Sequence, residues 1–355
     1  MALAEKKKNQ EPDESGEDVA ETDVPPAPLR LRLRAWWDGS SLQQVMAEEA
    51  NRLSEPEAGP QDGDVKVATA VSEPVEVEPE PDVPWPPSRI AMTEAVFGSG
   101  AIGPGGSART VDMVGAFGLG SDVNVLDVGS RLGGTARAIA LDYNAWVTGY
   151  ESDPELAAAA MAPERVDVTL NSANSGRSSK SSKIKLADKA RIHHADIETL
   201  EIKPGVYDCA FTREMLHNLR DKTRLLEEIL IGLKPHCPLL LTDYFVAPGK
   251  EEDPRVASLM GREADAPPFW TVSGAEKALG AMGFDLRISD DITAQYRRDL
   301  LDDFARFIGD HEKTGIPRQM VEPLLRLAEF WGNRVHAFDE GLVSVHKFVA
   351  LRSEG

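Results

Sequence analysis

The sequence predicts an α/β domain built on a mostly parallel β-sheet with helices on both faces. Residues 124–151, NVLDVGSRLGGTARAIALDYNAWVTGYE, contain an apolar strand, a glycine-interrupted turn, a helix over Thr135–Tyr143 and a second strand ending on Glu151. Together these form one βαβ unit. From there to the C-terminus, short apolar runs alternate with amphipathic segments, which is typical of α/β folds. The strands are apolar throughout, as burial of both faces of a parallel sheet requires.

The glycine turn predicts a site for an adenosine-containing ligand. Gly129, Gly133 and Gly134 allow a sharp turn and leave bare backbone at the helix N-terminus. Glu151 follows Gly129 by 22 residues, about where a nucleotide-binding βαβ unit places the acid that accepts the ribose hydroxyls. The turn lacks the spacing of a dinucleotide site or a P-loop. Asp127 would repel a pyrophosphate but could hold an amino group, as in S-adenosylmethionine; a βα turn without ligand is the alternative.

Acid and proline are concentrated in the first quarter of the chain. Residues 1–88 hold 12 of the 24 prolines, and 20 acidic against 8 basic residues, so −12 of the net charge of −20 lies there. We predict a largely disordered tail over residues 1–87 and one folded domain over residues 88–355. No basic stripe is available to displace counterions from phosphates, which argues against a nucleic-acid partner.

One island in the tail, Pro28–Leu53, has the composition of a docking segment. In Arg30–Trp37, arginines alternate with leucines and two tryptophans follow, and a short amphipathic helix is expected from Ser41 onward. Such a segment suits contact with a protein partner or with an anionic membrane surface. The alternative is an intramolecular latch onto the domain.

Cysteine and histidine usage indicates a reducing compartment and no metal site. Cys209 and Cys237 both fall in apolar strand-like runs, so two buried free thiols are expected. His193 and His194 are adjacent on a predicted strand, where neighbouring side chains point to opposite faces, so a shared metal ion is not expected. No apolar run approaches the about 20 residues that span a bilayer, and the N-terminus has no apolar core for secretion. We therefore expect a cytoplasmic protein.

Around the βαβ unit, helices are predicted over Ile90–Phe97, Ala108–Phe117 and Glu155–Met161. The glycine-rich loop over residues 98–106 could close over a ligand or simply connect two helices. The polar stretch Asn171–Lys185 is expected to be a mobile loop or an insertion.

Polar residues stand where the predicted strands end. Further strands are expected to end at Asp196, near Thr212 and at Tyr244, and a helix is expected over Asp221–Leu233. Ligands collect at the carboxyl ends of parallel strands, so these side chains should converge on one site. The strand ends carry Asp127, Glu151, Asp196, Thr212-Arg213-Glu214 and Asp243-Tyr244.

Two amphipathic helices are expected between the last two strands, FDLRIS and LVSVHKFVAL. Their apolar stripes are expected to pack in the core, and the alternative is a lid over the carboxyl ends of the sheet. The stripes are Ile292, Tyr296, Leu300, Phe304 and Ile308, and then Val321, Leu324, Ala328, Trp331, Val335 and Phe338.

In this order the motifs resemble the class I S-adenosylmethionine-dependent methyltransferases over nearly all of Ser88–Gly355. The likeness is closest to the small-molecule branch that contains the phosphoethanolamine methyltransferases. VFGSGAIGPGG is similar to its opening loop, VLDVGSRLGG to its cofactor turn, FTREMLHNLRDK to its fourth-strand segment and LLLTDYF to its fifth strand. The resemblance implies a Rossmann-like, seven-stranded, mostly parallel sheet, with a helical insertion before the last strand, Leu342–Leu351, which runs antiparallel between its neighbours.

The resemblance also implies roles for individual residues, with S-adenosylmethionine as the cofactor. The glycine turn with Asp127 would hold the methionine portion, Glu151 the ribose hydroxyls, and Asp196 with Ile197 the adenine. The cofactor-binding candidates are Asp127, Gly129, Ser130, Gly133, Glu151, Asp196, Ile197 and Thr212, and the catalytic candidates are Glu214, His217 and Tyr244.

The sequence departs from the family pattern in two places. Arg131 stands where the family's turn usually has glycine, so its side chain either crowds the cofactor or points outward. The histidine segment is also one residue out of step, which leaves His217 and Asn218 as alternatives for one position. The (Asp/Asn)-Pro-Pro-aromatic motif of nucleotide-base methyltransferases does not follow strand four, which argues against DNA and RNA substrates.

The leading hypothesis is methyl transfer to a small polar amine such as phosphoethanolamine. His217 would take the proton of the amine, Glu214 would orient His217, and Tyr244 would hold the acceptor; a helix-capping role is the alternative for His217. Two other functions stay open. One is a catalytically silent scaffold that acts through the N-terminal island, and the other is an enzyme for a lipid or quinone-like acceptor at a membrane surface.

Overall fold

The computed structural model describes residues 83–171, 183–262 and 266–354, together with Gln44, Met46 and Ala47. The chain divides into two compact units, residues 1–68 and 69–355. In the first unit, Gln44, Met46 and Ala47 are helical. The rest of the island, including the docking segment Arg30–Trp37, lies outside the described residues, so the predictions about the tail stay predictions.

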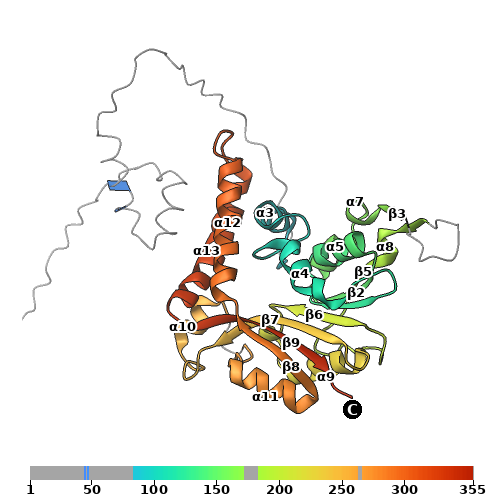
Figure 1. The fold of residues 1–355 in the computed structure, drawn as a ribbon. Coiled ribbons are helices and arrows are strands. Elements are labelled where there is room, and N and C mark those ends of the chain that lie inside the picture. The colour runs from blue at the N-terminus through green and yellow to red at the C-terminus, as the bar shows by residue number, and fades with distance from the viewer. Residues whose placement is uncertain (1–43, 45, 48–82, 172–182, 263–265, 355) are drawn as a thin grey trace, which may run out of the picture. The chain divides into compact units, whose positions relative to one another are not determined.

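The second unit is organised around a seven-stranded sheet with the strand order β5-β2-β1-β6-β7-β9-β8 (Figure 1). Its strands are β1 (Asn124–Val128), β2 (Trp146–Glu151), β5 (Ala190–His194), β6 (Cys209–Arg213), β7 (Pro238–Val246), β8 (Phe284–Asp291) and β9 (Val343–Arg352). Neighbouring strands from β5 to β7 are parallel, and β9 runs antiparallel to both β7 and β8. This confirms the predicted sheet, including the last strand between its neighbours.

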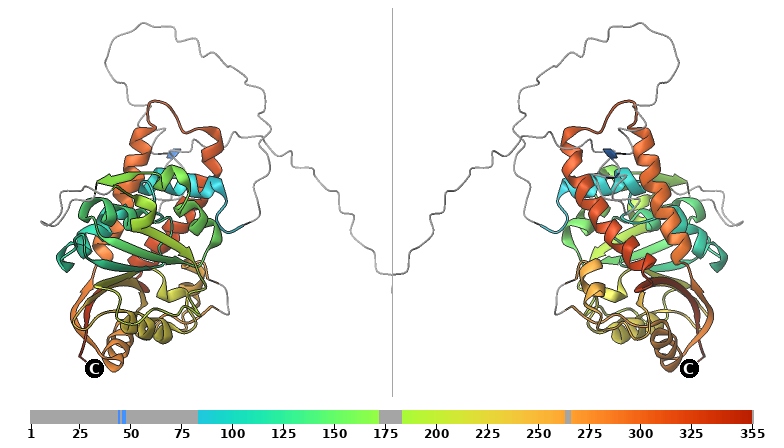
Figure 2. Two further views of the ribbon diagram at one scale, coloured as in Figure 1. Left: turned by 90° about the vertical axis from the view of Figure 1, so that its right-hand side faces the viewer. Right: turned by 90° about the vertical axis from the view of Figure 1, so that its left-hand side faces the viewer.

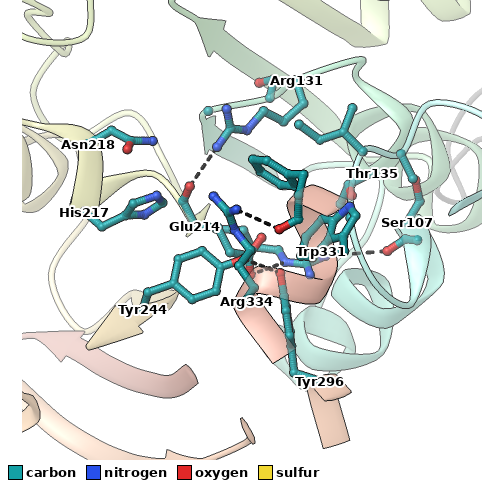
Figure 3. Close-up of a pocket in the computed structure, with 18 of the residues that line it drawn as sticks. Ser107, Arg131, Thr135, Glu214, His217, Asn218, Tyr244, Tyr296, Trp331 and Arg334 are labelled. Atoms are coloured by element: carbon teal, nitrogen blue, oxygen red, sulfur yellow. Dashed lines mark hydrogen bonds and ion pairs between the residues drawn. The ribbon is translucent and has the colours of Figure 1, made fainter. Parts of the chain in front are cut away.

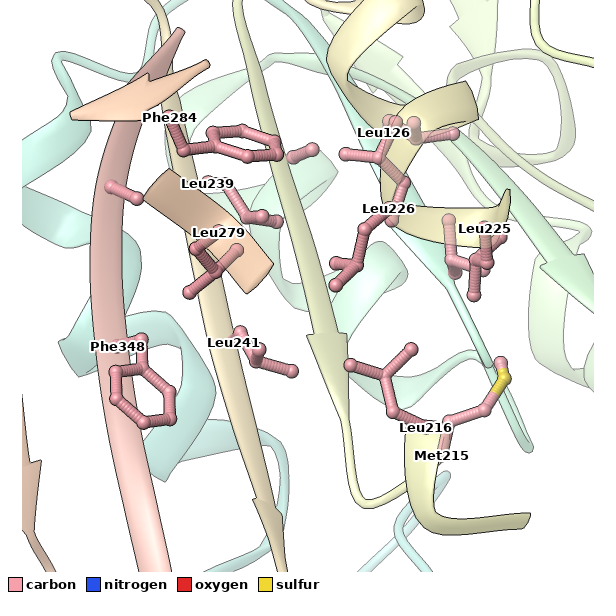
Figure 4. Packing of buried hydrophobic residues seen from close by; sticks show 14 of the residues in the cluster. Leu126, Met215, Leu216, Leu225, Leu226, Leu239, Leu241, Leu279, Phe284 and Phe348 are labelled. Carbon is pink, nitrogen blue, oxygen red and sulfur yellow. The ribbon is translucent and has the colours of Figure 1, made fainter. Parts of the chain in front are cut away.

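Helices cover both faces of the sheet, as predicted. One face packs against α4 (Gly106–Val114), α5 (Gly134–Tyr143), α6 (Pro154–Ala160) and α8 (Leu186–Lys189). The opposite face packs against α9 (Lys222–Gly232) and α11 (Val272–Met282). Figure 4 shows the second core, where Leu225 and Leu226 of α9 and Leu279 of α11 meet Leu126 of β1 and Phe348 of β9. Burying each such side chain stabilises the fold by roughly 1.5–3 kcal/mol.

The helical insertion packs against the first helix of the unit. The insertion consists of α12 (Thr293–Asp310) and α13 (Arg318–Asp339), which stand apart in Figure 2, and α3 (Pro87–Phe97) contacts both. The ring of Phe97 in α3 lies edge-on to those of Phe304 in α12 and Trp331 in α13, with centroids 6.0 and 5.4 Å apart. The apolar stripes of the insertion therefore form a core of their own, except for Ile308 at the end of the first stripe, which is exposed.

The glycine-rich loop over residues 98–106 is fixed to its surroundings. Gly105 N–H donates to the Asp303 carboxylate at 2.8 Å, and Arg109 forms two hydrogen bonds of 2.7 and 2.6 Å with Asp299 of the same helix, α12. On the other side, Gly134 N–H donates to the carbonyl oxygen of Gly100 at 3.0 Å. The loop thus connects the insertion with the glycine turn.

Several short elements complete the unit. They are η1 (Gly115–Phe117), α7 (Pro163–Val166), β3 (Thr169–Asn171), β4 (Lys183–Lys185), η2 (Leu216–Asn218) and α10 (Pro254–Leu259). The prediction of a loop over the whole of Asn171–Lys185 is wrong at both ends, because the main chains of β3 and β4 pair there as a two-stranded antiparallel sheet. Residues 172–182 lie outside the described residues.

The cysteine prediction is half right. Cys209 is buried on β6, whereas Cys237 is only partly buried, because it lies in the turn before β7. His193 and His194 are adjacent on β5. Within the described ranges, no cluster of three or more His, Cys, Asp or Glu residues could hold a metal ion, and the helices there are too short or too polar to cross a membrane.

Replacing Phe304 tests whether the insertion is part of the folded core. Phe304 is 1% exposed, so Phe304→Ala should leave a cavity and lower the free energy of unfolding by about 3–5 kcal/mol. Ile308 lies one turn further along α12 and is 38% exposed, and Ile308→Ala should cost less than about 1 kcal/mol. Urea unfolding of both variants measures the difference. Equal costs would show that α12 does not pack as described.

Candidate active site

A cavity of about 350 Å³ opens at the carboxyl ends of β1, β6 and β7. Its walls come from the glycine turn, the loop over residues 98–106, the segment after β6, and the helices α12 and α13 (Figure 3). Parallel α/β sheets place their ligands at this edge. The insertion therefore contributes part of the cavity as well as a core of its own.

The structure brings six of the eleven predicted site residues to this cavity. The six are Asp127, Gly129, Ser130, Glu214, His217 and Tyr244. The other five, Gly133, Glu151, Asp196, Ile197 and Thr212, lie outside its wall.

Local hydrogen bonds fix the glycine turn. Gly129 and Ser130 both donate their N–H to the carbonyl oxygen of Tyr150, at 2.8 and 3.0 Å, and this ties the turn to β2. Ser130 Oγ also donates to the carbonyl oxygen of Asp127 at 3.0 Å. Gly129 has a φ of +83°, and a Cβ there would lie 2.7 Å from Met215 Cε. Only glycine fits this position without displacing Met215.

Asp127 is a buried carboxylate at the cavity wall. Its side chain is 2% exposed. Burial and the nearby charge of Glu151 raise the pKa of Asp127 to about 7, although Ser130 and Arg131 act in the opposite direction. A cationic group in the cavity would stabilise the charged form of Asp127. This fits the predicted contact with an amino group.

Glu151 lies at the end of β2, behind the glycine turn. It is 1% exposed, and its Oε2 accepts the N–H of Arg131 at 2.7 Å while its Oε1 accepts that of Asp153 at 3.0 Å. The side chain of Arg131 continues from this point into the cavity wall. Glu151 is therefore adjacent to the cavity through Arg131 and does not line it.

The remaining four predicted cofactor residues do not line the cavity. Asp196 is exposed, and its carboxylate accepts the N–H of Glu198 at 2.9 Å and so closes a local turn. The side chains of Ile197 and Thr212 are buried, at 1% and 0% exposure. A Cβ on Gly133 would face Arg137, away from the cavity. Their proposed contacts with a cofactor remain predictions.

His217 and Asp243 form a buried pair. His217 lies on η2, and its Nδ1 is 2.6 Å from Asp243 Oδ1. The same carboxylate accepts the main-chain N–H groups of His217, at 3.1 Å, and Tyr244, at 2.7 Å. Burial lowers the pKa of His217 and outweighs the attraction of Asp243. The imidazole is thus neutral near pH 7, and since a carboxylate only accepts, Nδ1 carries the proton and Nε2 the lone pair.

The prediction that Glu214 orients His217 is wrong, because Asp243 has this role. Glu214 follows β6 with a φ of +44°. This conformation turns its carboxylate toward β7, where it accepts a hydrogen bond from Thr242 Oγ1 at 3.1 Å. The sequence showed Asp243 at a strand end but gave no sign of which imidazole it would meet.

Two tyrosines from distant parts of the chain meet in the cavity. The hydroxyl oxygens of Tyr244, on β7, and Tyr296, on α12, are 2.8 Å apart. Burial raises the pKa of Tyr244 to about 12 and that of Tyr296 well above its ordinary value, so both hydroxyls keep their protons. The sequence placed Tyr296 on the apolar stripe of a helix and therefore in the core.

Arg334 and Trp331 of α13 line the same cavity, and each has a buried donor without a partner in the described part of the chain. Arg334 is 7% exposed, and it donates to the main-chain oxygens of Phe330 at 3.1 Å and Met260 at 3.2 Å. Its Nε and the Nε1 of Trp331 have no hydrogen-bond partner among the described residues. Sequence analysis missed Arg334, although an arginine beside the apolar stripe was a signal for it.

Trp85 also lines the cavity. It lies just before α3, and the guanidinium of Arg89 stacks over its ring at 4.0 Å. The domain boundary predicted at Ser88 therefore excludes a residue of the site. The surrounding run of prolines and acids concealed this, because it continues the composition of the tail.

Comparison with known proteins supports the assignment of this fold. A family model described as a methyltransferase domain matches residues 126–241. Phosphoethanolamine N-methyltransferase 1 of Triticum aestivum is 28% identical over 233 residues, which are 66% of this chain and 42% of that protein. The phosphoethanolamine N-methyltransferase of Plasmodium falciparum is 23% identical over 248 residues, which are 69% of this chain and 85% of that protein.

A solved structure agrees with these matches. Phosphoethanolamine N-methyltransferase 2 of Haemonchus contortus, in complex with phosphomonomethylethanolamine and S-adenosylhomocysteine, superposes with a TM-score of 0.60 at 21% sequence identity. The superposition covers 75% of this chain and 57% of that one. This chain thus spans less than half of the wheat protein and little more than half of the nematode one.

Residues 126–241 match a methyltransferase domain, and the strand order is that of the class I S-adenosylmethionine-dependent methyltransferase fold. Within that class, the chain is distantly similar to the phosphoethanolamine N-methyltransferases. The resemblance predicted from the sequence is confirmed at this level.

A pair of truncations tests the place of Trp85. Deleting residues 1–82 should leave the melting temperature of the domain within about 2 °C of that of the full chain, because the residues that line the cavity are kept. Deleting residues 1–87 also removes Trp85 and the first residue of α3, and should lower the melting temperature by several degrees, about 2–4 °C per kcal/mol lost. Differential scanning fluorimetry of both forms measures this. If both truncations melt alike, Trp85 does not stabilise the domain.

Proposed function

We propose that this chain is an S-adenosylmethionine-dependent methyltransferase that methylates a small polar amine, with phosphoethanolamine as the first acceptor to test. The observation that carries the proposal is the neutral His217, held by Asp243, in the same cavity as the glycine turn. The similarity to the phosphoethanolamine N-methyltransferases of wheat and Plasmodium falciparum supports the choice of acceptor.

The residues present fit the cofactor at its amino-acid end. Asp127 offers a buried carboxylate for the ammonium group, and Gly129 lines the cavity beside it. Glu151 would accept the ribose hydroxyls. When bound, S-adenosylmethionine supplies a methyl group that its sulfonium already activates. The protein then has to align the acceptor, exclude water and take up one proton.

His217 is suited to take the proton of an amine acceptor. A nitrogen nucleophile reacts only when its lone pair is free, so a neutral base beside it raises the reactive fraction. Asp243 fixes the ring and stabilises the imidazolium that forms. Tyr244, packed against the imidazole with ring centroids 4.9 Å apart, keeps its proton and can donate a hydrogen bond to the acceptor.

The donors of α13 favour an acceptor that also carries an anionic group. Arg334 Nε and Trp331 Nε1 lack partners, and leaving a buried donor unpaired costs roughly 1–3 kcal/mol. A phosphate or carboxylate oxygen could satisfy both. The cavity would thus combine a base for the amine with donors for the anion, as phosphoethanolamine requires.

A catalytically silent methyltransferase fold is the second candidate. One observation favours it: the side chain of Arg131 lies in the wall of the cavity and donates to the carbonyl oxygen of Glu214 at 2.7 Å. Calorimetric titration with S-adenosylhomocysteine, followed by a methylation assay with phosphoethanolamine, separates the two candidates. Binding with methyl transfer supports the enzyme, whereas the absence of transfer to any amine supports the silent fold, and the absence of binding contradicts the enzyme.

Replacing His217 tests whether this residue is the general base. His217→Asn should lower turnover about a hundredfold or more and leave the affinity for S-adenosylhomocysteine nearly unchanged, since general-base catalysis is typically worth 10²–10⁴. His193→Asn, on the exposed part of β5, is the matched control and should keep full activity. Full activity of His217→Asn would remove His217 as the base and make Asn218 and Glu214 the next residues to test.

The activity should also depend on pH in a defined direction. Burial lowers the pKa of His217 below its ordinary 6.5, so the base of the unliganded enzyme should be mainly neutral at pH 7 and should be lost as the pH falls. We therefore expect kcat/KM, corrected for the titration of the amine acceptor, to fall as the pH decreases, with a midpoint below pH 6.5. A midpoint above pH 7 in the corrected profile would contradict the role of the buried imidazole as the base.

Cofactor binding should release protons from Asp127. With a pKa of about 7, Asp127 is about half protonated at pH 7, and the ammonium group of S-adenosylhomocysteine would drive it to the charged form. The release should approach one proton at pH 5.5 and vanish at pH 8.5. Calorimetry in buffers of different ionisation enthalpy measures it, and Asp127→Asn should abolish it. Proton uptake, or no buffer dependence at pH 5.5, would place the ammonium group elsewhere.

A further inference from the structure

Arg131 occupies the centre of the glycine turn in a backbone conformation that favours glycine. Its φ is +54°, a region that is strained for residues with a Cβ. Such strain persists only where neighbouring contacts fix the backbone. Here the N–H of Arg131 is held by Glu151 Oε2 at 2.7 Å.

The side chain of Arg131 forms a bridge across the cleft. Its Nη2 donates to the carbonyl oxygen of Glu214 at 2.7 Å (Figure 3). Glu214 is itself fixed, because its N–H donates to the carbonyl oxygen of Thr242 at 2.8 Å. The Arg131–Glu214 bridge therefore joins the turn after β1 to the segment after β6.

This bridge lies next to both ends of the expected cofactor site. The Arg131 side chain lines the same cavity as Asp127 and Gly129, whereas Glu151 lies outside the cavity wall and contacts the main-chain N–H of Arg131. A ligand with its ammonium group at Asp127 and its ribose at Glu151 has to pass the position that the Arg131 side chain occupies.

The charge of Arg131, like the size of its side chain, opposes the binding of a cationic ligand. The guanidinium lies near enough to favour the charged form of Asp127 and the neutral form of His217. It thus offers Asp127 a cation from the protein itself. A ligand that brings its own cation is repelled by the guanidinium unless Arg131 moves away.

We propose that Arg131 is an autoinhibitory latch on the cofactor cleft, and that S-adenosylmethionine binds only after the Arg131–Glu214 bridge opens. The inference rests on the proposed function, because the ligand that opens the latch is the cofactor. Opening consumes part of the binding free energy, so the natural chain binds more weakly than its glycine turn alone would allow. Glu214 begins the segment that carries His217, so opening also frees the catalytic side of the cleft.

The test compares S-adenosylhomocysteine binding to the full chain and to two variants at position 131. Arg131→Gly removes the bridge and the strain, and should raise the affinity about tenfold or more, mainly through a faster association rate. Arg131→Lys keeps the cation and the Cβ, and should bind within about threefold of the natural chain. Calorimetry gives the affinities, stopped-flow fluorescence gives the rates, and melting temperatures confirm that both variants are folded.

The outcomes separate this inference from the proposed function. If Arg131→Gly binds S-adenosylhomocysteine as tightly as the natural chain or less tightly, the latch is wrong while the cofactor assignment stands. If S-adenosylhomocysteine binds to Arg131→Gly but not to the natural chain, the latch is supported in its strongest form. If neither protein binds, the proposed function fails and the latch fails with it.

Discussion

The carboxylate of Asp243 holds together the side of the cavity formed by β7 and the turn after β6. It accepts three hydrogen bonds, two from His217 and one from the main chain of Tyr244. These fix the 3₁₀ turn after β6 against the end of β7, and they set the orientation of the imidazole. Because Asp243 is only 2% exposed, its lone pairs depend on these donors. Loss of the carboxylate would therefore release both His217 and the turn that carries it.

Burial of polar groups at one edge of the sheet explains the electrostatics of the site. The same desolvation raises the pKa of Asp127, lowers that of His217 and keeps the hydroxyls of Tyr244 and Tyr296 protonated. The helical insertion contributes to this burial, because Tyr296 of α12 and Trp331 and Arg334 of α13 line the cavity. The edge consequently holds a neutral base and protonated donors side by side, a combination that proton transfer near neutral pH needs.

The sequence predicted the sheet well because its signals are local. The apolar strands, the glycine turn and the amphipathic helices each follow from the spacing of residues within about twenty positions. The contacts that complete the site are not local. Asp243 and His217 are 26 residues apart, and Tyr244 and Tyr296 are 52 apart. The sequence pattern around a residue of an apolar stripe, such as Tyr296, does not distinguish a core side chain from one that also lines a cavity.

The protonation state of His217 is the point on which this account of catalysis rests most directly. Nitrogen-15 NMR of the histidine side chains, with His217→Asn used to assign the signal, reports both the tautomer and the pKa. The account predicts a neutral ring at pH 7 with the proton on Nδ1 and a pKa below 6.5. A ring protonated at pH 7, or a neutral ring with the proton on Nε2, would contradict it.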